Sequence, residues 1–200
     1  MNSKAALPLG LLLLAYASGC ATPLSVAPPP DTGQEPALPS GRLSPDGQWI
    51  LTQTQTSDPP GRRLLVAPRD TMRYREVLSG LPGARYQTLW SSPPAPPLLV
   101  VVDPRPHRHS SCHVYDPVAR KIWRIDKQAN ADMDRTVPEP LEKRQTRARA
   151  VSPDGSKILL DITGTIRNAP FYKVYVVESA TGAIVRTYRH EYLTPEQWWK

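Results

Sequence analysis

One four-residue turn motif occurs twice in this chain with the same apolar residues around it. LSPDGQWIL spans residues 43–51 and VSPDGSKIL spans residues 151–159. In this motif proline sets φ for the first central position of a type I turn, serine and aspartate side chains bond to nearby backbone amides, and glycine takes the positive φ that closes a hairpin. A turn repeated between apolar runs predicts a repeated β unit, which limits the chain to folds that stack such units.

Each copy continues as a short strand, a loop, a strand, a turn and a strand. The first copy reads WILTQTQ, RRLLVAP and REVL, and the last reads KILLDITG, KVYVVES and IVRTY. A middle copy lacks the motif, but Ser92 aligns with Ser44 and Leu98 with Ile50 without gaps, and PLLVVVD, CHVYDP and KIWRID supply its strands. The sequence therefore predicts three four-stranded repeats, at about 42–80, 88–126 and 149–188.

This repeat resembles the blades of TolB-type, WD-like β-propellers. The likeness rests on SPDG before a strand, twice, and on VYVVESATG, and it covers residues 41–188. It implies an all-β fold of three four-stranded blades. Because closed propellers have roughly four to eight blades, we expect a partial propeller or a curved sandwich over 42–193. The outer sheets could merge into a compact monomer, which we favour, pair with a second copy as a six-bladed homodimer, or bind a partner protein.

The N-terminus reads as an export signal. Lys4 precedes an apolar run, residues 5–17, that is too short to cross a bilayer. The sequence ASGC that ends at Cys20 resembles the lipobox of bacterial lipoproteins, which implies a signal peptide over 1–19 and a lipidated Cys20. An ordinary secretory signal is the alternative. Ala21 takes the place where that family uses Asp for inner-membrane retention, so the resemblance implies the outer membrane, facing the periplasm.

Proline dominates the segment that follows Cys20. Residues 21–41 contain six prolines, which predicts an extended tether over 20–41. The net charge of +7 becomes +6 once residues 1–19, with one lysine and no acid, are removed. This charge is either a solubility feature or suits anionic headgroups or an acidic protein. It forms no basic stripe interleaved with aromatic residues, so we expect no nucleic-acid partner.

Two segments are candidates for partner binding. Residues 127–148 are charged, contain two prolines and lack apolar periodicity, which predicts a long loop. Its basic end is either a solvated loop or a contact for an acidic partner, through Lys143, Arg144, Arg147 and Arg149. At the C-terminus Thr194 can cap a helical turn over 194–200, with Pro195 in its first position. There Trp198 and Trp199 either cover an open sheet face or bind a partner.

One cluster has the residue types of a metal site. His107, His109, Cys112 and His113 lie within seven residues, and imidazole and thiolate suit zinc or copper. On a strand Cys112 and His113 would face opposite ways, so all four converge only if the loop folds back. The alternative is a polar loop with one buried thiol. With Cys20 lipidated, Cys112 has no partner for an internal disulfide.

No catalytic motif is present. The chain has no GxSxG elbow, no phosphate-cradling glycine loop and no HExxH, so we expect no enzymatic activity and no cofactor. We predict a membrane-anchored envelope lipoprotein that acts as a protein-binding or scaffold module, for example an accessory subunit of an envelope complex or an inhibitor or immunity protein. The alternative is a zinc- or copper-binding periplasmic lipoprotein that uses the 107–113 cluster.

Overall fold

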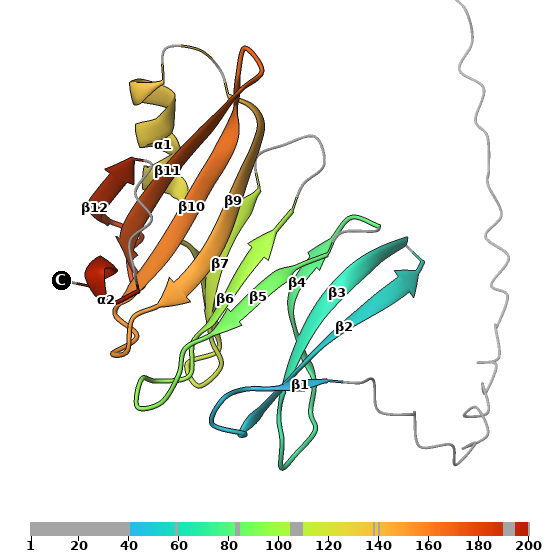
Figure 1. Ribbon diagram of the computed structural model, residues 1–200. Coiled ribbons are helices and arrows are strands. Elements are labelled where there is room, and N and C mark those ends of the chain that lie inside the picture. Colours follow the sequence, from blue (N-terminus) through green and yellow to red (C-terminus); the bar gives the residue numbers. More distant parts are fainter. Residues whose placement is uncertain are drawn as a thin grey trace, which may run out of the picture. The chain divides into compact units, whose positions relative to one another are not determined.

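The computed structural model of the protein describes residues 41–58, 60–82, 85–104, 110–137, 139, 141–189 and 195–199. The predicted signal peptide, Cys20 and all but Gly41 of the tether lie outside these residues. The fold is all-β, with three four-stranded antiparallel sheets, each made of four consecutive strands (Figure 1). Neither of the helices in the described residues has the length and apolarity to span a membrane.

The elements follow one another as three meanders. Sheet A comprises β1 (Arg42–Leu43), β2 (Trp49–Ser57), β3 (Pro60–Pro68) and β4 (Arg75–Gly80). Sheet B comprises β5 (Gln87–Trp90), β6 (Leu99–Asp103), β7 (Ser111–Asp116) and β8 (Lys121–Arg124). Sheet C comprises β9 (Glu142–Val151), β10 (Lys157–Ile166), β11 (Ala169–Glu178) and β12 (Ile184–Arg189). Helix α1 (Lys127–Thr136) precedes sheet C, and α2 (Pro195–Trp198) follows it.

The prediction of a long charged loop over 127–148 is wrong. This region contains α1 and most of β9. In β9, Arg144, Thr146 and Ala148 are buried while the residues between them are exposed, which is the period-two pattern of a strand. Two of these three buried residues are polar, so a search for apolar periodicity misses the strand. Helix α1 buries only Ala129 and Met133, which is too weak a signal to recognise among its charged neighbours.

In sheets A and C a buried serine holds the turn between the first and second strands. Ser44 Oγ accepts a hydrogen bond from Trp49 N at 3.0 Å, and Ser152 Oγ accepts one from Lys157 N at 2.8 Å. The glycines of both SPDG motifs have the expected positive φ, 70° at Gly47 and 76° at Gly155. The motif is therefore a structural device that starts the second strand of a sheet.

In sheet B the equivalent serine is Ser91. Its Oγ accepts a hydrogen bond from Leu98 N at 2.8 Å and donates one to Pro96 O at 2.6 Å. The bonded pair is seven residues apart rather than the five seen at Ser44. The gapless alignment of Ser92 with Ser44 is wrong, because the middle turn is two residues longer.

Sheet B lies between the other two sheets and is covered on both faces. Leu99 and Val101 of β6 pack against sheet A, and Val100 and Val102 pack against sheet C. None of these four side chains is more than 3% exposed. Strand β6 is therefore a continuous apolar run, because a strand buried on both faces has no solvent-facing positions for polar residues.

Four equivalent positions recur in the register of each sheet and face the same way along the stack. Between β2 and β3 the pairs are Leu51 with Val66 and Gln53 with Leu64. Between β6 and β7 they are Val100 with Val114 and Val102 with Cys112. Between β10 and β11 they are Leu159 with Val176 and Asp161 with Val174. In sheet A the apolar members of these pairs pack on sheet B, and in sheet B they pack on sheet C. In sheet C they form the face turned away from sheet B, which we call the terminal face: Leu159, Val174 and Val176.

Candidate protein-binding face

Two tryptophans cover the terminal face. Trp198 and Trp199 pack against the buried side chains of Leu159, Val174 and Val176. The two indole rings are 6.3 Å apart in an edge-to-face arrangement, with 86° between their planes. Of the two expected arrangements, the structure has the tryptophans on an open sheet face. They cover this face of sheet C as sheet B covers the equivalent face of sheet A, and as sheet C covers that of sheet B. The predicted cap, Thr194, lies outside the described residues.

Arginines border the terminal face on the side of β9. Arg147 lies directly opposite Asp161 in the register, and Arg149 Nε is 2.5 Å from Asp161 Oδ2. The Arg149 guanidinium also lies 5.9 Å from the centroid of the Tyr172 ring, a cation–π contact. Both arginines are on exposed positions of β9.

Asp161 is a buried carboxylate within this arginine group. It is 3% exposed, and Tyr172 donates a hydrogen bond to its Oδ1 at 2.9 Å. Burial raises the pKa of Asp161, and the Tyr172 hydrogen bond and the positive charges of Arg149 and Arg147 offset this only in part. The Tyr172 hydrogen bond and the two arginines therefore favour the charged form of this buried carboxylate.

The opposite border of the terminal face is strand β12. Arg186 pairs with Val176 in the register and Tyr188 pairs with Val174, so both side chains lie on the terminal face. Arg186 Nη1 donates a hydrogen bond to the Tyr188 hydroxyl at 3.2 Å. The face thus has an apolar centre under two tryptophans, with tyrosine and arginine on both sides.

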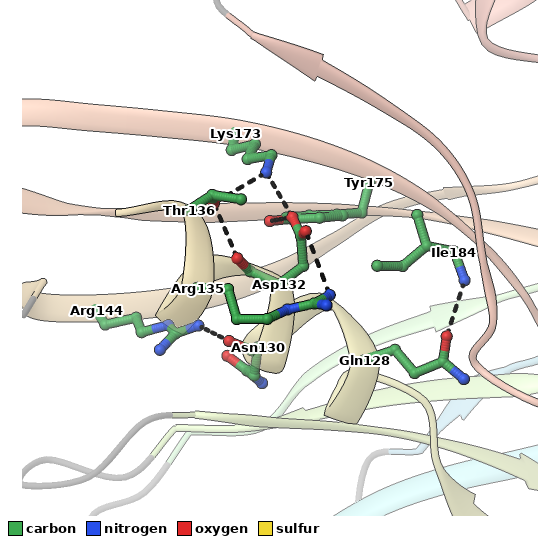
Figure 2. A network of polar contacts seen from close by, with 9 residues as sticks. All are labelled: Gln128, Asn130, Asp132, Arg135, Thr136, Arg144, Lys173, Tyr175 and Ile184. Atoms are coloured by element: carbon green, nitrogen blue, oxygen red, sulfur yellow. Dashed lines mark hydrogen bonds and ion pairs between the residues drawn. The ribbon is translucent and has the colours of Figure 1, made fainter. Parts of the chain in front are cut away.

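The other two predicted partner contacts lie elsewhere on β9. Only 3% of the Arg144 side chain is exposed, and it donates a hydrogen bond to Asp134 Oδ1 at 2.7 Å. It also donates one to the Asn130 carbonyl at 2.9 Å (Figure 2), so it fastens β9 to α1. Lys143 is exposed, with φ of 50°, where the β9–β10 register shifts. The structure therefore brings four of the six predicted residues to one face: Arg147, Arg149, Trp198 and Trp199.

A buried polar network joins α1 to sheet C, and it had no signal in the sequence. Lys173 Nζ lies 2.5 Å from Asp132 Oδ2, and the Tyr175 hydroxyl donates to the same oxygen at 2.9 Å (Figure 2). Burial acts to raise the pKa of Asp132, but the hydrogen bonds from Lys173 and Tyr175 and the positive charge of Lys173 outweigh it, so this pKa is lowered. Burial and the bond to Asp132 raise the pKa of Tyr175. This network holds α1 in place.

The fold is similar to that of a solved β-propeller. The β-propeller domain of the Trilobed protease from Pyrococcus furiosus, described as having an open velcro topology, superposes with a TM-score of 0.50 and 13% identity, over 76% of this chain and 42% of that chain. The three sheets are propeller blades. TolB from Acinetobacter baumannii gives a TM-score of 0.42 and 16% identity, over 74% of this chain and 31% of that chain.

The likeness to the Pyrococcus propeller shows the fold, and both matches cover only part of the other protein. This chain spans less than half the length of either solved structure. No family model matches the sequence. No curated protein matches it either. The propeller-like blades expected from the three repeats are confirmed at the level of fold.

Strand β7 places two of the predicted metal ligands, Cys112 and His113, on opposite faces of sheet B. Cys112 is fully buried in the core between blades B and C, whereas the neighbouring His113 is half-buried, with its Nε2 bonded to Ser111 Oγ at 3.0 Å. Burial raises the pKa of the Cys112 thiol well above its usual value, the Asp126 charge adds to this, and Arg124 opposes it. This disfavours the thiolate that binds metals.

The remaining predicted ligands, His107 and His109, lie outside the described residues, so the four-ligand cluster stays a prediction. Within the described ranges, no three His, Cys, Asp or Glu side chains gather as a metal site would require.

Proposed function

We propose that this protein is a non-catalytic envelope lipoprotein that binds another envelope protein through the terminal face of blade C. The observation that carries the proposal is the convergence of Arg147, Arg149, Trp198 and Trp199 on that face. Tryptophan, tyrosine and arginine are the residues most enriched among those that dominate protein–protein binding energy. The blade fold is compatible with such a module.

The position of this face in the stack supports the same role. Its apolar residues, Leu159, Val174 and Val176, are equivalent to those by which blades A and B each receive a neighbouring sheet. A surface built for sheet packing at the end of a stack is suited to receive a partner's surface. The tryptophan pair shields the apolar centre from water when no partner is bound.

The envelope location in this proposal comes from the N-terminal sequence. A lipidated Cys20 followed by a proline-rich tether would hold the three blades near the outer membrane, on its periplasmic side. The partner would then be a component of an envelope complex, or a toxin that the protein inhibits. A Cys20→Ser variant should lose lipid and no longer fractionate with membranes; a variant that kept its lipid would remove the lipoprotein assignment.

Site-specific photo-crosslinking in intact source cells tests the binding face. A photoreactive residue replaces Gln145, which is exposed on β9 opposite Thr163, next to the arginine group. A matched control replaces Val118, which is 68% exposed in the turn between β7 and β8 of blade B. We expect one dominant adduct with another envelope protein from position 145 and not from position 118.

The result separates three possibilities. Equal adducts from both positions, or none from either, would contradict the proposed face. Adducts that contain only a second copy of this chain would support the six-bladed homodimer in its place.

A further inference from the structure

Strand β9 contains a β-bulge at the border of the terminal face. Its register with β10 shifts so that Ala150 lies opposite Leu159 and Ala148 lies opposite Leu160, which leaves Arg149 as the extra residue. The equivalent ladders of the other two blades, β1 with β2 and β5 with β6, show no shift over their paired residues. A bulge changes the direction of a side chain and is often found next to a functional site. Here it brings the Arg149 side chain onto the terminal face, where its carboxylate partner lies.

Two side chains hold the Arg149 guanidinium in one place. Its Nε lies 2.5 Å from Asp161 Oδ2, and its central carbon lies 5.9 Å from the centroid of the Tyr172 ring. The Tyr172 hydroxyl donates a hydrogen bond to Asp161 Oδ1 at 2.9 Å, so the three side chains hold one another. The Arg149 side chain nevertheless remains 41% exposed. A guanidinium that is fixed and still exposed offers its other N–H groups to the hydrogen-bond acceptors of a partner.

The fold of the blades does not require a carboxylate at position 161. In the register the equivalent residues are Gln53 in blade A and Val102 in blade B, and Val102 is 3% exposed because it packs against blade C. A buried ion pair is often no more stabilising than apolar residues of similar size, because each charge must leave water. Asp161 therefore has a cost that the other two blades avoid. A residue that departs from the pattern of its repeat without improving the packing points to a function.

We infer that Asp161 is a positioning residue of the binding face: it holds Arg149 against Tyr172, so that the arginine is already ordered when the partner arrives. The inference rests on the proposed function, because it assigns a role at the same face. Ordering a long side chain during binding weakens affinity roughly two- to tenfold, and the contacts with Asp161 and Tyr172 remove that loss in advance. Arg149 contacts the partner, and Asp161 acts through Arg149.

Crosslinking from position 145 in intact source cells measures the effect on the partner. Asp161→Asn keeps the size of the side chain and an acceptor for Tyr172, but it removes the charge. We expect it to lower the yield of the adduct roughly two- to tenfold, while the unfolding midpoint stays equal or rises. The matched control is Glu76→Gln, which removes the carboxylate of the exposed pair with Arg63 in blade A. This control should leave the yield within about 1.5-fold of that of the unmodified protein.

Variants of Arg149 show whether Asp161 acts through it. Arg149→Lys keeps the charge but loses the planar guanidinium that lies over Tyr172, so it should lower the yield of the adduct as much as Asp161→Asn does. The double variant should be no weaker than either single variant, because each change removes the same interaction. Additive losses would show that Asp161 acts by another route and would overturn the inference.

The reactivity of the arginines provides a measurement that needs no partner. Phenylglyoxal modifies accessible guanidinium groups, and peptide mass spectrometry of the full-length protein follows each arginine separately. Asp161→Asn should speed the modification of Arg149 roughly two- to fivefold, because the guanidinium loses its ion pair. Arg120, which is exposed in the turn between β7 and β8, should react at the same rate in both proteins. An unchanged rate at Arg149 would overturn the positioning role.

The outcomes of crosslinking distinguish failure of this inference from failure of the proposed function. An adduct that forms equally well in Asp161→Asn would overturn the positioning role and leave the protein-binding function standing. A loss of adduct together with a lowered unfolding midpoint in Asp161→Asn would show a purely structural role and would also overturn the inference. No adduct from position 145 in the unmodified protein would overturn both the inference and the proposed function.

Discussion

Lys173 Nζ lies 2.5 Å from Asp132 Oδ2, and this ion pair links strand β11 of blade C to helix α1. The Lys173 side chain is 6% exposed and that of Asp132 is 19% exposed, so water screens the pair only weakly. A charge left alone in such a place is costly because neither water nor its partner compensates it. Because only two apolar residues of the helix are buried, its attachment to the sheet depends on this pair.

Removing both members of the pair should not cost the sum of the two single removals, because each single change leaves the other charge without its partner. We expect Lys173→Met to lower the free energy of unfolding by roughly 2–4 kcal/mol, and Lys173→Met with Asp132→Asn to cost less than the sum of the single changes. Denaturant unfolding of the four proteins measures the coupling. The exposed pair of Arg63 and Glu76, at 3.3 Å, is the control, and Arg63→Gln should change stability by about 0.5 kcal/mol or less. Additive single and double changes would contradict the coupling.

Acid should destabilise the protein through Asp132. Its folded pKa is lowered, so its contribution is fully present above the unfolded pKa of about 3.9 and is lost as pH falls through the folded value. Hydrogen bonds from Ser152 and Ser156 lower the pKa of Asp154 to about 2, so the stability contributed by Asp154 is also lost as pH falls. Denaturant unfolding at several pH values below about 5 should show falling stability, with a shallower fall in Asp132→Asn. Parallel curves for the two proteins would contradict this assignment.

The raised pKa of Asp161 should change stability with pH in the opposite direction. Because burial disfavours its ionised form in the folded state, ionisation of this residue lowers stability as pH rises above the unfolded value of about 3.9. Asp161→Asn should therefore remove a destabilising slope just above that pH. The same unfolding series, extended to Asp161→Asn, measures it, and an unchanged slope would be evidence against a raised pKa.

The serine of the middle turn can be identified by paired alanine substitutions. Ser91→Ala removes the acceptor for Leu98 N and the donor to Pro96 O in a buried site, and should lower the free energy of unfolding by about 1–2 kcal/mol. Ser92→Ala, one residue later and exposed, should have an effect near zero. Thermal or denaturant unfolding compares the two. A larger loss of unfolding free energy in Ser92→Ala would support Ser92 as the equivalent of Ser44, as in the gapless alignment.

Gly182 lies against blade B and should tolerate no side chain. Its φ is 72°, and a Cβ there would lie 2.5 Å from the carbonyl oxygen of Ile125. Gly47 has a similar φ of 70°, but its nearest contact would be Arg69 Nη1 at 4.0 Å. Gly47→Ala should cost about 1 kcal/mol from backbone strain alone, and Gly182→Ala roughly 2 kcal/mol more. Similar unfolding midpoints for the two variants would show that blades B and C separate without cost at this contact.

Cys112 should behave as a core residue. It occupies the position that Leu64 takes in blade A and Val174 in blade C, so Cys112→Val should change the free energy of unfolding by less than about 1.5 kcal/mol. Cys112→Ser buries a hydroxyl among apolar groups and should cost about 1–3 kcal/mol.

The reactivity of the same thiol provides an independent measurement. Because Cys112 is fully buried and its pKa is raised, iodoacetamide should modify it only after unfolding, as peptide mass spectrometry can follow. Rapid modification of the folded protein would contradict its place in the core.

Local signals in the sequence were sufficient for the class of fold. The SPDG turns, the short strands between them and VYVVESATG depend on neighbouring residues, so the number of blades and the antiparallel meanders could be predicted. The helical turn with Trp198 and Trp199 was predicted for the same reason, because it is encoded within a few residues at the C-terminus.

The arrangement of the candidate site was decided by tertiary contacts. Arg147 and Arg149 lie on the same face of the sheet as Trp198 only because β9 is the first strand of blade C. Burial of the polar residues Arg144 and Thr146 hides that strand from a search for apolar periodicity. Asp132 and Lys173 are 41 residues apart, so no local pattern links them. The sequence by itself determined which residue types repeat and where the turns lie. Only the packed structure decided which charges are neutralised and which are exposed on the terminal face, because burial and pairing depend on strands that are distant in the chain.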